Sequence, residues 1–162
     1  MDTYRTYSID EAKTRMESYC AYRERCHKEV AMKLGEMRMI PEAVDHIIHH
    51  LITHNYLNET RFAQAFARGK FRIKKWGKNR IVRELKARDM SQYNINLAIK
   101  EISQIEYLET FHELAEKRWE QLNSEENLQK KKKKFADYLL YRGWESILIW
   151  ERLNELISSE KK

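Results

Sequence analysis

The sequence has little glycine and almost no proline, the two residues that most often interrupt helices. Only four glycines and one proline occur among 162 residues, and β-branched runs of strand length are missing. No apolar run approaches the roughly 18 to 20 residues that a membrane-spanning helix needs. The composition therefore predicts an all-α fold without a membrane span.

Cysteines and export signals are also scarce. The chain has two cysteines, Cys20 and Cys26, and its first residues, MDTYRTYSIDEAK, lack the apolar segment of a secretory signal. Two thiols in such a chain do not indicate a disulfide framework. We expect a cytoplasmic protein with reduced cysteines.

The sequence lacks the common signatures of catalysis. It contains no Gly-rich phosphate loop, no zinc-protease pattern and no nucleophile elbow, so we expect neither an enzyme nor a bound cofactor.

One group of histidines could hold a metal, because His residues four apart share a helix face. However, the apolar stripe of this segment leaves the imidazoles at its edge or in solvent, and no cysteine completes a zinc spacing. We therefore favour a surface role over a metal site for His46, His49, His50 and His54.

Charge is distributed in blocks, although the net charge is only +6. From Arg68 to Arg88 there are ten basic residues against one acid, Glu84, and Lys130 to Lys134 are five consecutive lysines. Residues 101–128 carry eight glutamates against Lys117 and Arg118. Clustered charge of this kind indicates where a charged partner binds.

The chain repeats itself. A displacement of 51 residues carries Tyr56-Leu57 to Tyr107-Leu108 and Leu34 to Leu85. The same displacement carries Val44, Ile48 and Leu51 to Ile95, Ile99 and Ile102, and a further 54 residues lead to Ile149, Leu153 and Leu156. The spacing of four and three within each set is that of one helix face. Internal repetition of this length is typical of helical repeat proteins.

Helix ends are marked by capping residues. Ser8 with Glu11 has capping-box spacing, Asn58 and Ser91 are expected N-caps, and Pro41 suits a first helical turn. Gly77 and Gly143 are expected to adopt the left-handed conformation that ends a helix.

These signals predict three tandem three-helix repeats over residues 1–55, 56–106 and 107–162. A unit of about 50 residues buries little apolar surface alone, so adjacent units are expected to pack on one another. We expect an elongated, curved array that is monomeric.

Three segments resemble the RecX family. They are Tyr56 to Ala63, which is similar to Tyr-Leu-Asp-Asp-x-Arg-Phe-Ala, Gly77 to Leu85, which is similar to Gly-x-x-Arg-Ile-x-x-Glu-Leu, and Tyr141 to Trp144, which is similar to Arg-Arg-Gly-Phe. Asn58-Glu59 replaces an acidic pair, and Asp89-Met90 replaces Gly-Ile. The resemblance implies a modulator that lies in the groove of the RecA–DNA filament and usually limits recombinase and coprotease activity.

The basic residues are the candidate contacts with filament and single-stranded DNA phosphates. The block could instead be a solvated surface, but like charges this close repel one another, which favours an anionic partner. The lysine run is equally consistent with a phosphate-seeking helix start and with a solubilising surface. Phe71 and Trp76 could stack on bases, yet their spacing favours the core. The candidate residues are Arg61, Arg68, Lys70, Arg72, Lys74, Lys75, Lys78, Arg80, Arg83, Lys130, Lys131, Lys132 and Lys133.

Two other functions compete with filament modulation. The stretch from Arg80 to Ile99 could act as a DNA-binding helix-turn-helix, although its recurrence in every unit argues for an extended surface instead. A purely structural adaptor between proteins would make the basic block incidental.

Overall fold

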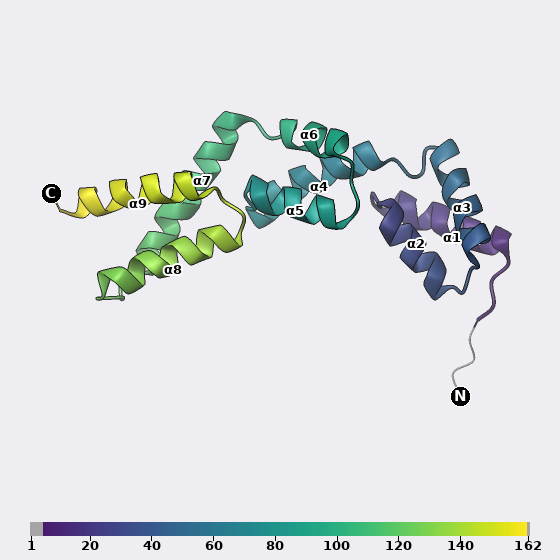
Figure 1. Cartoon of the computed structure of the whole chain (residues 1–162), viewed down its shortest axis with the longest axis horizontal. Coiled ribbons are helices and arrows are strands. Elements are labelled where there is room, and N and C mark those ends of the chain that lie inside the picture. Colours follow the sequence, from purple (N-terminus) through teal and green to yellow (C-terminus); the bar gives the residue numbers. More distant parts are fainter. Residues whose placement is uncertain (1–4, 162) are drawn as a thin grey trace.

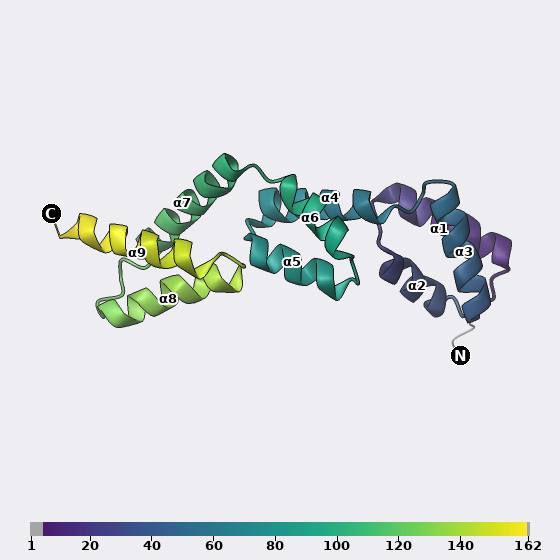
Figure 2. The same cartoon turned by 45° about the horizontal axis from the view of Figure 1, so that its top comes forward.

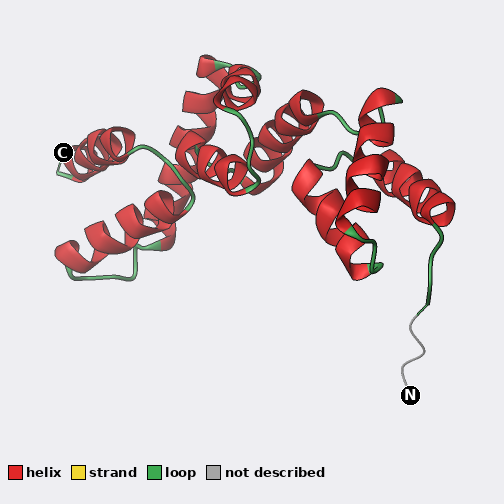
Figure 3. Cartoon of the chain, turned by 45° about the vertical axis from the view of Figure 1, so that its right-hand side comes forward, coloured by secondary structure: helices red, strands yellow, loops and turns green. Residues whose placement is uncertain are grey.

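The computed structural model describes residues 5–161, and within them the chain forms nine α-helices and no strand (Figure 3). The predicted all-α class is confirmed. The helices are α1 (Ile9–Tyr22), α2 (His27–Glu36), α3 (Pro41–Thr53), α4 (Glu59–Lys74), α5 (Lys78–Ala87), α6 (Gln92–Lys100), α7 (Gln104–Gln121), α8 (Leu128–Tyr141) and α9 (Ser146–Glu160).

The helices form three consecutive triplets that follow one another along the long axis of the molecule (Figure 1). We call α1–α3 the first unit, α4–α6 the second and α7–α9 the third. The view in Figure 2 shows the same end-to-end order, and the most extensive helix–helix contacts lie within units. The predicted elongated array of three-helix repeats is therefore present.

The boundary predicted between residues 55 and 56 lies in the connection between α3 and α4. The boundary predicted between residues 106 and 107 falls inside the first turn of α7, which starts at Gln104. Tyr56 precedes its helix, whereas its sequence counterpart Tyr107 lies within α7. The recurring Tyr-Leu pair thus occupies different positions in the two units.

The second helix of each unit ends in the same way. Arg38, Asp89 and Gly143 follow these helices at equivalent positions, with positive φ angles of 63°, 59° and 91°. After each of them, the next amide donates back into the helix: Met39 N to Leu34 O, Met90 N to Leu85 O and Trp144 N to Leu139 O, all at 3.1 Å. This left-handed helix ending is a repeated structural element.

Most of the predicted caps are present. Ser8 and Glu11 form a capping box, Asn58 and Ser91 accept amide hydrogen bonds at the starts of α4 and α6, and Pro41 opens α3. The prediction for Gly77 is wrong, because its φ is −77° and it is the N-cap of α5. Lys75 takes the left-handed conformation at the end of α4 instead, with φ 59°.

Buried side chains form two cores. One lies in the first unit and includes Met16, Leu34 and Ile47. The other runs without interruption through the second and third units and also takes in Cys26 from the first. The expectation that all adjacent units share apolar packing holds between the second and third units. Between the first and second units, Cys26 joins the core of the second unit, and ion pairs such as Arg61 with Glu24 add polar contacts.

Aromatic residues of the third unit form hydrogen bonds with the backbone of the second. The Trp144 ring lies 4.6 Å from the Tyr107 ring and 5.3 Å from the Phe111 ring, centroid to centroid. The Trp144 indole N–H donates to the carbonyl oxygen of Lys75 at 3.1 Å. The Tyr107 hydroxyl accepts from the Lys78 amide at 2.9 Å and donates to Glu145. These contacts fix the third unit against the end of α4 and the start of α5.

Candidate nucleic-acid interface

The basic block occupies α4, α5 and the short connection between them. Phe62, Ala63, Ala67 and Phe71 form the buried face of α4, and Ile81 and Leu85 form that of α5. The expectation that Phe71 belongs to the core is confirmed, and Trp76 packs against the same core while half-buried. The basic side chains therefore project from the remaining faces, where the structure sorts them into groups with different surroundings.

Arg61 connects the first and second units. Its guanidinium pairs with Glu24 and donates to Asn55 Oδ1 at 3.2 Å, to Asn55 O at 3.1 Å and to Tyr56 O at 3.3 Å. The N–H donors of the Arg61 guanidinium therefore already have acceptors within the protein. Because these bonds already engage its guanidinium, we leave Arg61 out of the interface.

Three basic residues face the connection between α6 and α7. Arg68 pairs with Glu101 at 3.2 Å and Arg72 with Glu106 at 3.7 Å. The Lys78 ammonium donates to Gln104 Oε1 at 3.3 Å and lies 4.4 Å from the centre of the Tyr107 ring. The charges of Arg68 and Arg72 are partly neutralised, and at all three residues a bound anion would compete with internal partners.

Arg80 is placed between two aromatic rings. Its guanidinium carbon lies 4.1 Å from the centre of the Trp76 ring and 4.8 Å from that of Tyr141, and its Nη1 donates to Tyr141 O at 3.3 Å. Because Tyr141 belongs to α8, Arg80 links the second unit to the third. The Arg80 side chain therefore stabilises the packing of the second unit on the third, and its charge is less available to a ligand than that of an unpaired cation.

Lys70 lies in a cluster of positive charge. Its ammonium is 5.5 Å from the Phe66 ring centre and 5.0 Å from that of Trp76. Burial lowers the pKa of Lys70, and the neighbouring charges of Lys74, Arg88 and Arg23 lower it further. Arg23 and Arg88 are not among the residues predicted from the sequence. Arg88 belongs to the basic block, whereas Arg23 lies in the α1–α2 connection, where no sequence pattern marks it.

Lys74, Lys75 and Arg83 are exposed. Within the described residues they form no ion pair with an acidic side chain. Unpaired exposed cations lose least when they bind phosphate, because no internal partner must be displaced. We call Lys74, Lys75 and Arg83 the free basic patch.

The lysine run is only partly available to a ligand. Lys131 is 7% exposed; its ammonium lies 3.9 Å from the Trp119 ring centre and pairs with Glu160 at 3.6 Å. Including Lys131 among surface contacts is therefore wrong, because its side chain is built into the third unit. Lys133 pairs with Asp137 at 2.6 Å, and Lys134 with Glu125 at 2.7 Å. Lys130 and Lys132 keep no ion pair within the described residues.

The histidines do not converge on a common point. His46, His49 and His54 are exposed, while His50 lies 3.5 Å from Glu17 and against the His54 ring. Across residues 5–161 no three His, Cys, Asp or Glu side chains are grouped as metal ligands. In the same residues no helix combines the length and apolar composition needed to cross a membrane.

Two solved structures share this architecture. The crystal structure of RecX from Lactobacillus salivarius has a TM-score of 0.76 and 23% sequence identity, covering 91% of this chain and 96% of that one. A second crystal structure, of a regulatory protein RecX, has a TM-score of 0.79 and 20% identity, covering 91% of this chain and 73% of that one. These similarities establish the fold.

Sequence comparison identifies the family. Residues 58–99 match the model of the second three-helix domain of RecX, and residues 105–153 match that of the third. The regulatory protein RecX of Clostridioides difficile is 26% identical over 152 residues, which are 93% of this chain and 70% of that protein. The RecX of Yersinia pseudotuberculosis is 32% identical over 104 residues, 64% of this chain and 55% of the relative. Since the two domain models together match more than half of the sequence, the chain belongs to the RecX family of regulatory proteins.

Proposed function

We propose that this protein binds the RecA filament on single-stranded DNA and limits its recombinase and coprotease activity without catalysing a reaction. The observation that carries the proposal is the free basic patch, three exposed cations without acidic partners, on a chain that belongs to a family of regulatory proteins. A filament offers a continuous row of phosphates, which suits such a patch.

The shape of the molecule supports the same proposal. An elongated array presents a longer surface than a globular domain of equal size, and a filament groove is a long partner. The second and third units share one core, so the free basic patch is displayed on a rigid support. A preorganised surface loses less entropy when it binds.

The test of the regulatory role uses purified protein and RecA on single-stranded DNA. We expect added protein to slow ATP hydrolysis by RecA and to shorten the filaments at stoichiometric ratios. If hydrolysis and filament length do not change, the proposed action on RecA is wrong. If hydrolysis is faster and the filaments are longer, the protein activates RecA and does not limit it.

The role of the free basic patch is tested by salt dependence. We expect a smaller slope of log affinity for single-stranded DNA against log salt in the triple variant Lys74→Gln, Lys75→Gln, Arg83→Gln. The slope should fall in magnitude by about 2, since each phosphate contact contributes roughly 0.7. A matched triple variant, Lys100→Gln, Lys117→Gln, Lys161→Gln, removes the same charge from exposed positions elsewhere and should keep the slope.

Binding to duplexes of different sequence, and filament binding by the triple variant, separate the competing functions. A helix-turn-helix protein would discriminate between duplex sequences, whereas a phosphate-binding patch would not. A protein adaptor would bind the filament normally when the free basic patch is neutralised. Either result would contradict the DNA-facing half of the proposal.

A further inference from the structure

A pocket of about 590 Å³ lies in the first unit, between α1 and α2. It is separate from the free basic patch and lies outside the residues that the two RecX domain models match. Its volume is in the range of pockets that hold small organic ligands. The lining residues that matter for its chemistry are three tyrosines and three cations: Tyr7, Tyr19, Tyr22, Arg15, Arg25 and Lys33.

Guanidinium groups lie against the faces of two of these tyrosines. The guanidinium carbon of Arg25 is 3.7 Å from the centre of the Tyr19 ring, and that of Arg15 is 4.9 Å from the centre of the Tyr7 ring. Tyr22, the last residue of α1, is 85% exposed. Flat aromatic and guanidinium surfaces of this kind are where nucleic-acid bases stack.

Positive charge is built into the same pocket. Arg25 is only 7% exposed; its Nε donates to Tyr19 O at 3.0 Å and its Nη1 lies 3.7 Å from Glu29. Arg15 is exposed at the rim, and Lys33 lies 3.6 Å from Glu36, the acidic residue of the lining. Arg25 and Lys33 each have an acidic neighbour, so Arg15 is the lining cation that is most available to a phosphate.

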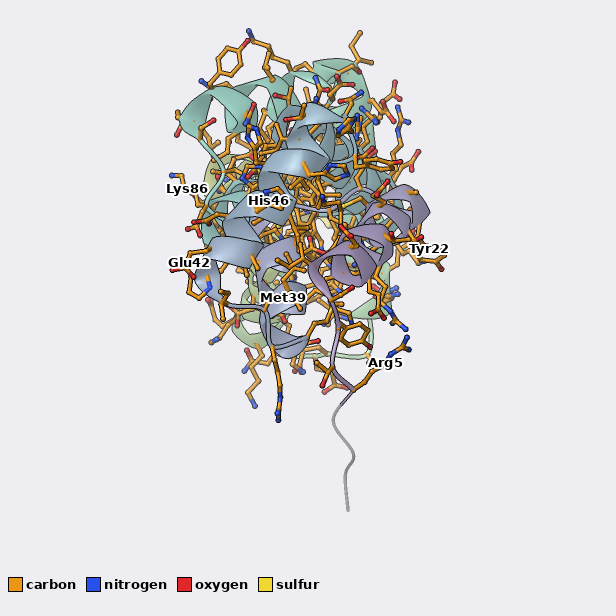
Figure 4. All side chains as sticks on the ribbon, turned by 90° about the vertical axis from the view of Figure 1, so that its right-hand side faces the viewer. Arg5, Tyr22, Met39, Glu42, His46 and Lys86 are labelled. Atoms are coloured by element: carbon orange, nitrogen blue, oxygen red, sulfur yellow. The ribbon has the colours of Figure 1, made fainter. Side chains whose placement is uncertain are left out.

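Tyr22 lies on the side of the first unit opposite His46 (Figure 4). Looking along the long axis of the molecule, Figure 4 shows Tyr22 and Arg5 on the side of α1 and Glu42 and His46 on the opposite side. Arg5 adds a further guanidinium 4.9 Å from the Tyr7 ring centre. Cations and rings therefore gather on the α1 side of the unit.

We propose that this pocket binds a nucleotide, with its base stacked on Tyr22 and its phosphate held by Arg15. The ligand chemistry is an aromatic base joined to a phosphate, which a segment of single-stranded DNA or a free nucleotide can supply. An acidic peptide would satisfy the cations but would leave the tyrosine surfaces unused. The inference goes beyond the filament role and does not depend on it.

The experiment measures binding of a fluorescently labelled thymidine oligonucleotide to the full chain. Tyr22→Ala should weaken binding roughly fivefold or more, because a stacked base contributes about 1–3 kcal/mol. Tyr22→Trp, which keeps an aromatic face, should restore it. Tyr93→Ala is the matched control, since Tyr93 is 70% exposed on α6 and lies outside the pocket.

An abasic oligonucleotide of the same length separates stacking from phosphate binding. Wild type and Tyr22→Ala should bind it equally, and the salt dependence of Tyr22→Ala should match wild type because no charge is lost. These measurements distinguish this pocket from the free basic patch. The triple variant of the free basic patch should change the salt slope, and adding Tyr22→Ala to it should still weaken oligonucleotide binding.

Free thymidine monophosphate identifies the source of the nucleotide. If Tyr22→Ala loses binding of thymidine monophosphate but binds the oligonucleotide normally, the ligand is a free nucleotide. If it binds thymidine monophosphate normally but binds the oligonucleotide more weakly, the ligand is a DNA segment. Tyr22→Ala that binds both ligands like wild type would overturn the proposal. An oligoglutamate peptide that requires Tyr22 while neither nucleotide ligand does would also overturn it and assign the pocket to an acidic protein segment.

Discussion

Gly77 and Gly143 lie so close together that a Cβ atom on Gly77 would stand 2.4 Å from the carbonyl oxygen of Gly143. Hydrogen bonds hold this approach: the Gly77 amide donates to Arg142 O at 2.8 Å, and the Asn79 amide donates to Gly143 O at 3.0 Å. The second and third units thus meet backbone to backbone, and only glycine fits at the N-cap of α5.

Gly77→Ala is expected to destabilise the protein, because the added methyl group meets backbone atoms that cannot rotate away. We expect a loss of about 1–3 kcal/mol in the free energy of unfolding, measured by urea titration. Gly69→Ala is the control, since nothing lies within 4 Å of the Cβ position in the middle of α4; it should gain about 0.5–1 kcal/mol. Equal effects of the two variants would refute the close approach.

Arg61→Gln should lower stability without changing DNA binding. The variant leaves Glu24 without its guanidinium partner, and Glu24 Oε2 already lacks a hydrogen bond, so we expect a loss of about 1–2 kcal/mol. Arg83→Gln should behave in the opposite way, with normal stability and a flatter salt dependence for single-stranded DNA. If Arg61→Gln reduces the dependence of single-stranded DNA affinity on salt, Arg61 contacts phosphate and belongs to the interface.

Neighbouring lysines in the run of five should respond differently to substitution. Lys131→Gln removes the ammonium from the Trp119 ring and from Glu160, and we expect a loss of about 1–3 kcal/mol in a urea titration. Lys130→Gln changes an exposed residue and should stay within about 0.5 kcal/mol of wild type. Similar midpoints for both variants would mean that Lys131 is solvated like its neighbours.

The two cysteine thiols should be unreactive in the folded protein. Burial raises the pKa of Cys20 and Cys26 from 9.0 to about 11, so the reactive thiolate is scarce near pH 8. Ellman's reagent should therefore react slowly until urea unfolds the chain. Rapid reaction of one thiol without urea would show that its side chain is accessible.

The same pKa shifts predict a loss of stability at alkaline pH. A folded-state pKa above the unfolded value means that the folded chain holds these protons more tightly. This contribution is fully present below pH 9 and is lost as the pH rises through about 11. Urea titrations across that range measure it, and a double Cys→Ser variant should lose this part of the pH dependence.

The repeat could be predicted because its apolar positions recur at a fixed displacement. The bounds of α2 and α5 differ by 51 residues at both ends, as the pairing of Leu34 with Leu85 predicts. Of the three repeated left-handed endings, only the one at Gly143 was predicted. Arg38 and Asp89 adopt it without the glycine that normally marks it, because the following hydrogen bond and the packing of each unit impose the conformation.

The site could be predicted only in part. Charge counts located the basic block but could not distinguish free cations from paired ones, which depends on acids brought in by other helices. Lys131 carried a signal, since it stands four residues before the buried Phe135 and therefore on the same helix face. Arg23 carried none, because its approach to Lys70 depends on how the first unit docks.

From the two separate cores we expect two cooperative folding blocks. Helices α4–α9 share one core, whereas α1–α3 have their own and meet the rest through polar contacts such as Arg61 with Glu24 and Lys28 with Ala87 O. Because α1–α3 have a core of their own, we expect the first unit to open by itself at a lower free energy than global unfolding. Amide hydrogens of α1–α3 will then exchange with solvent sooner than those of α4–α9.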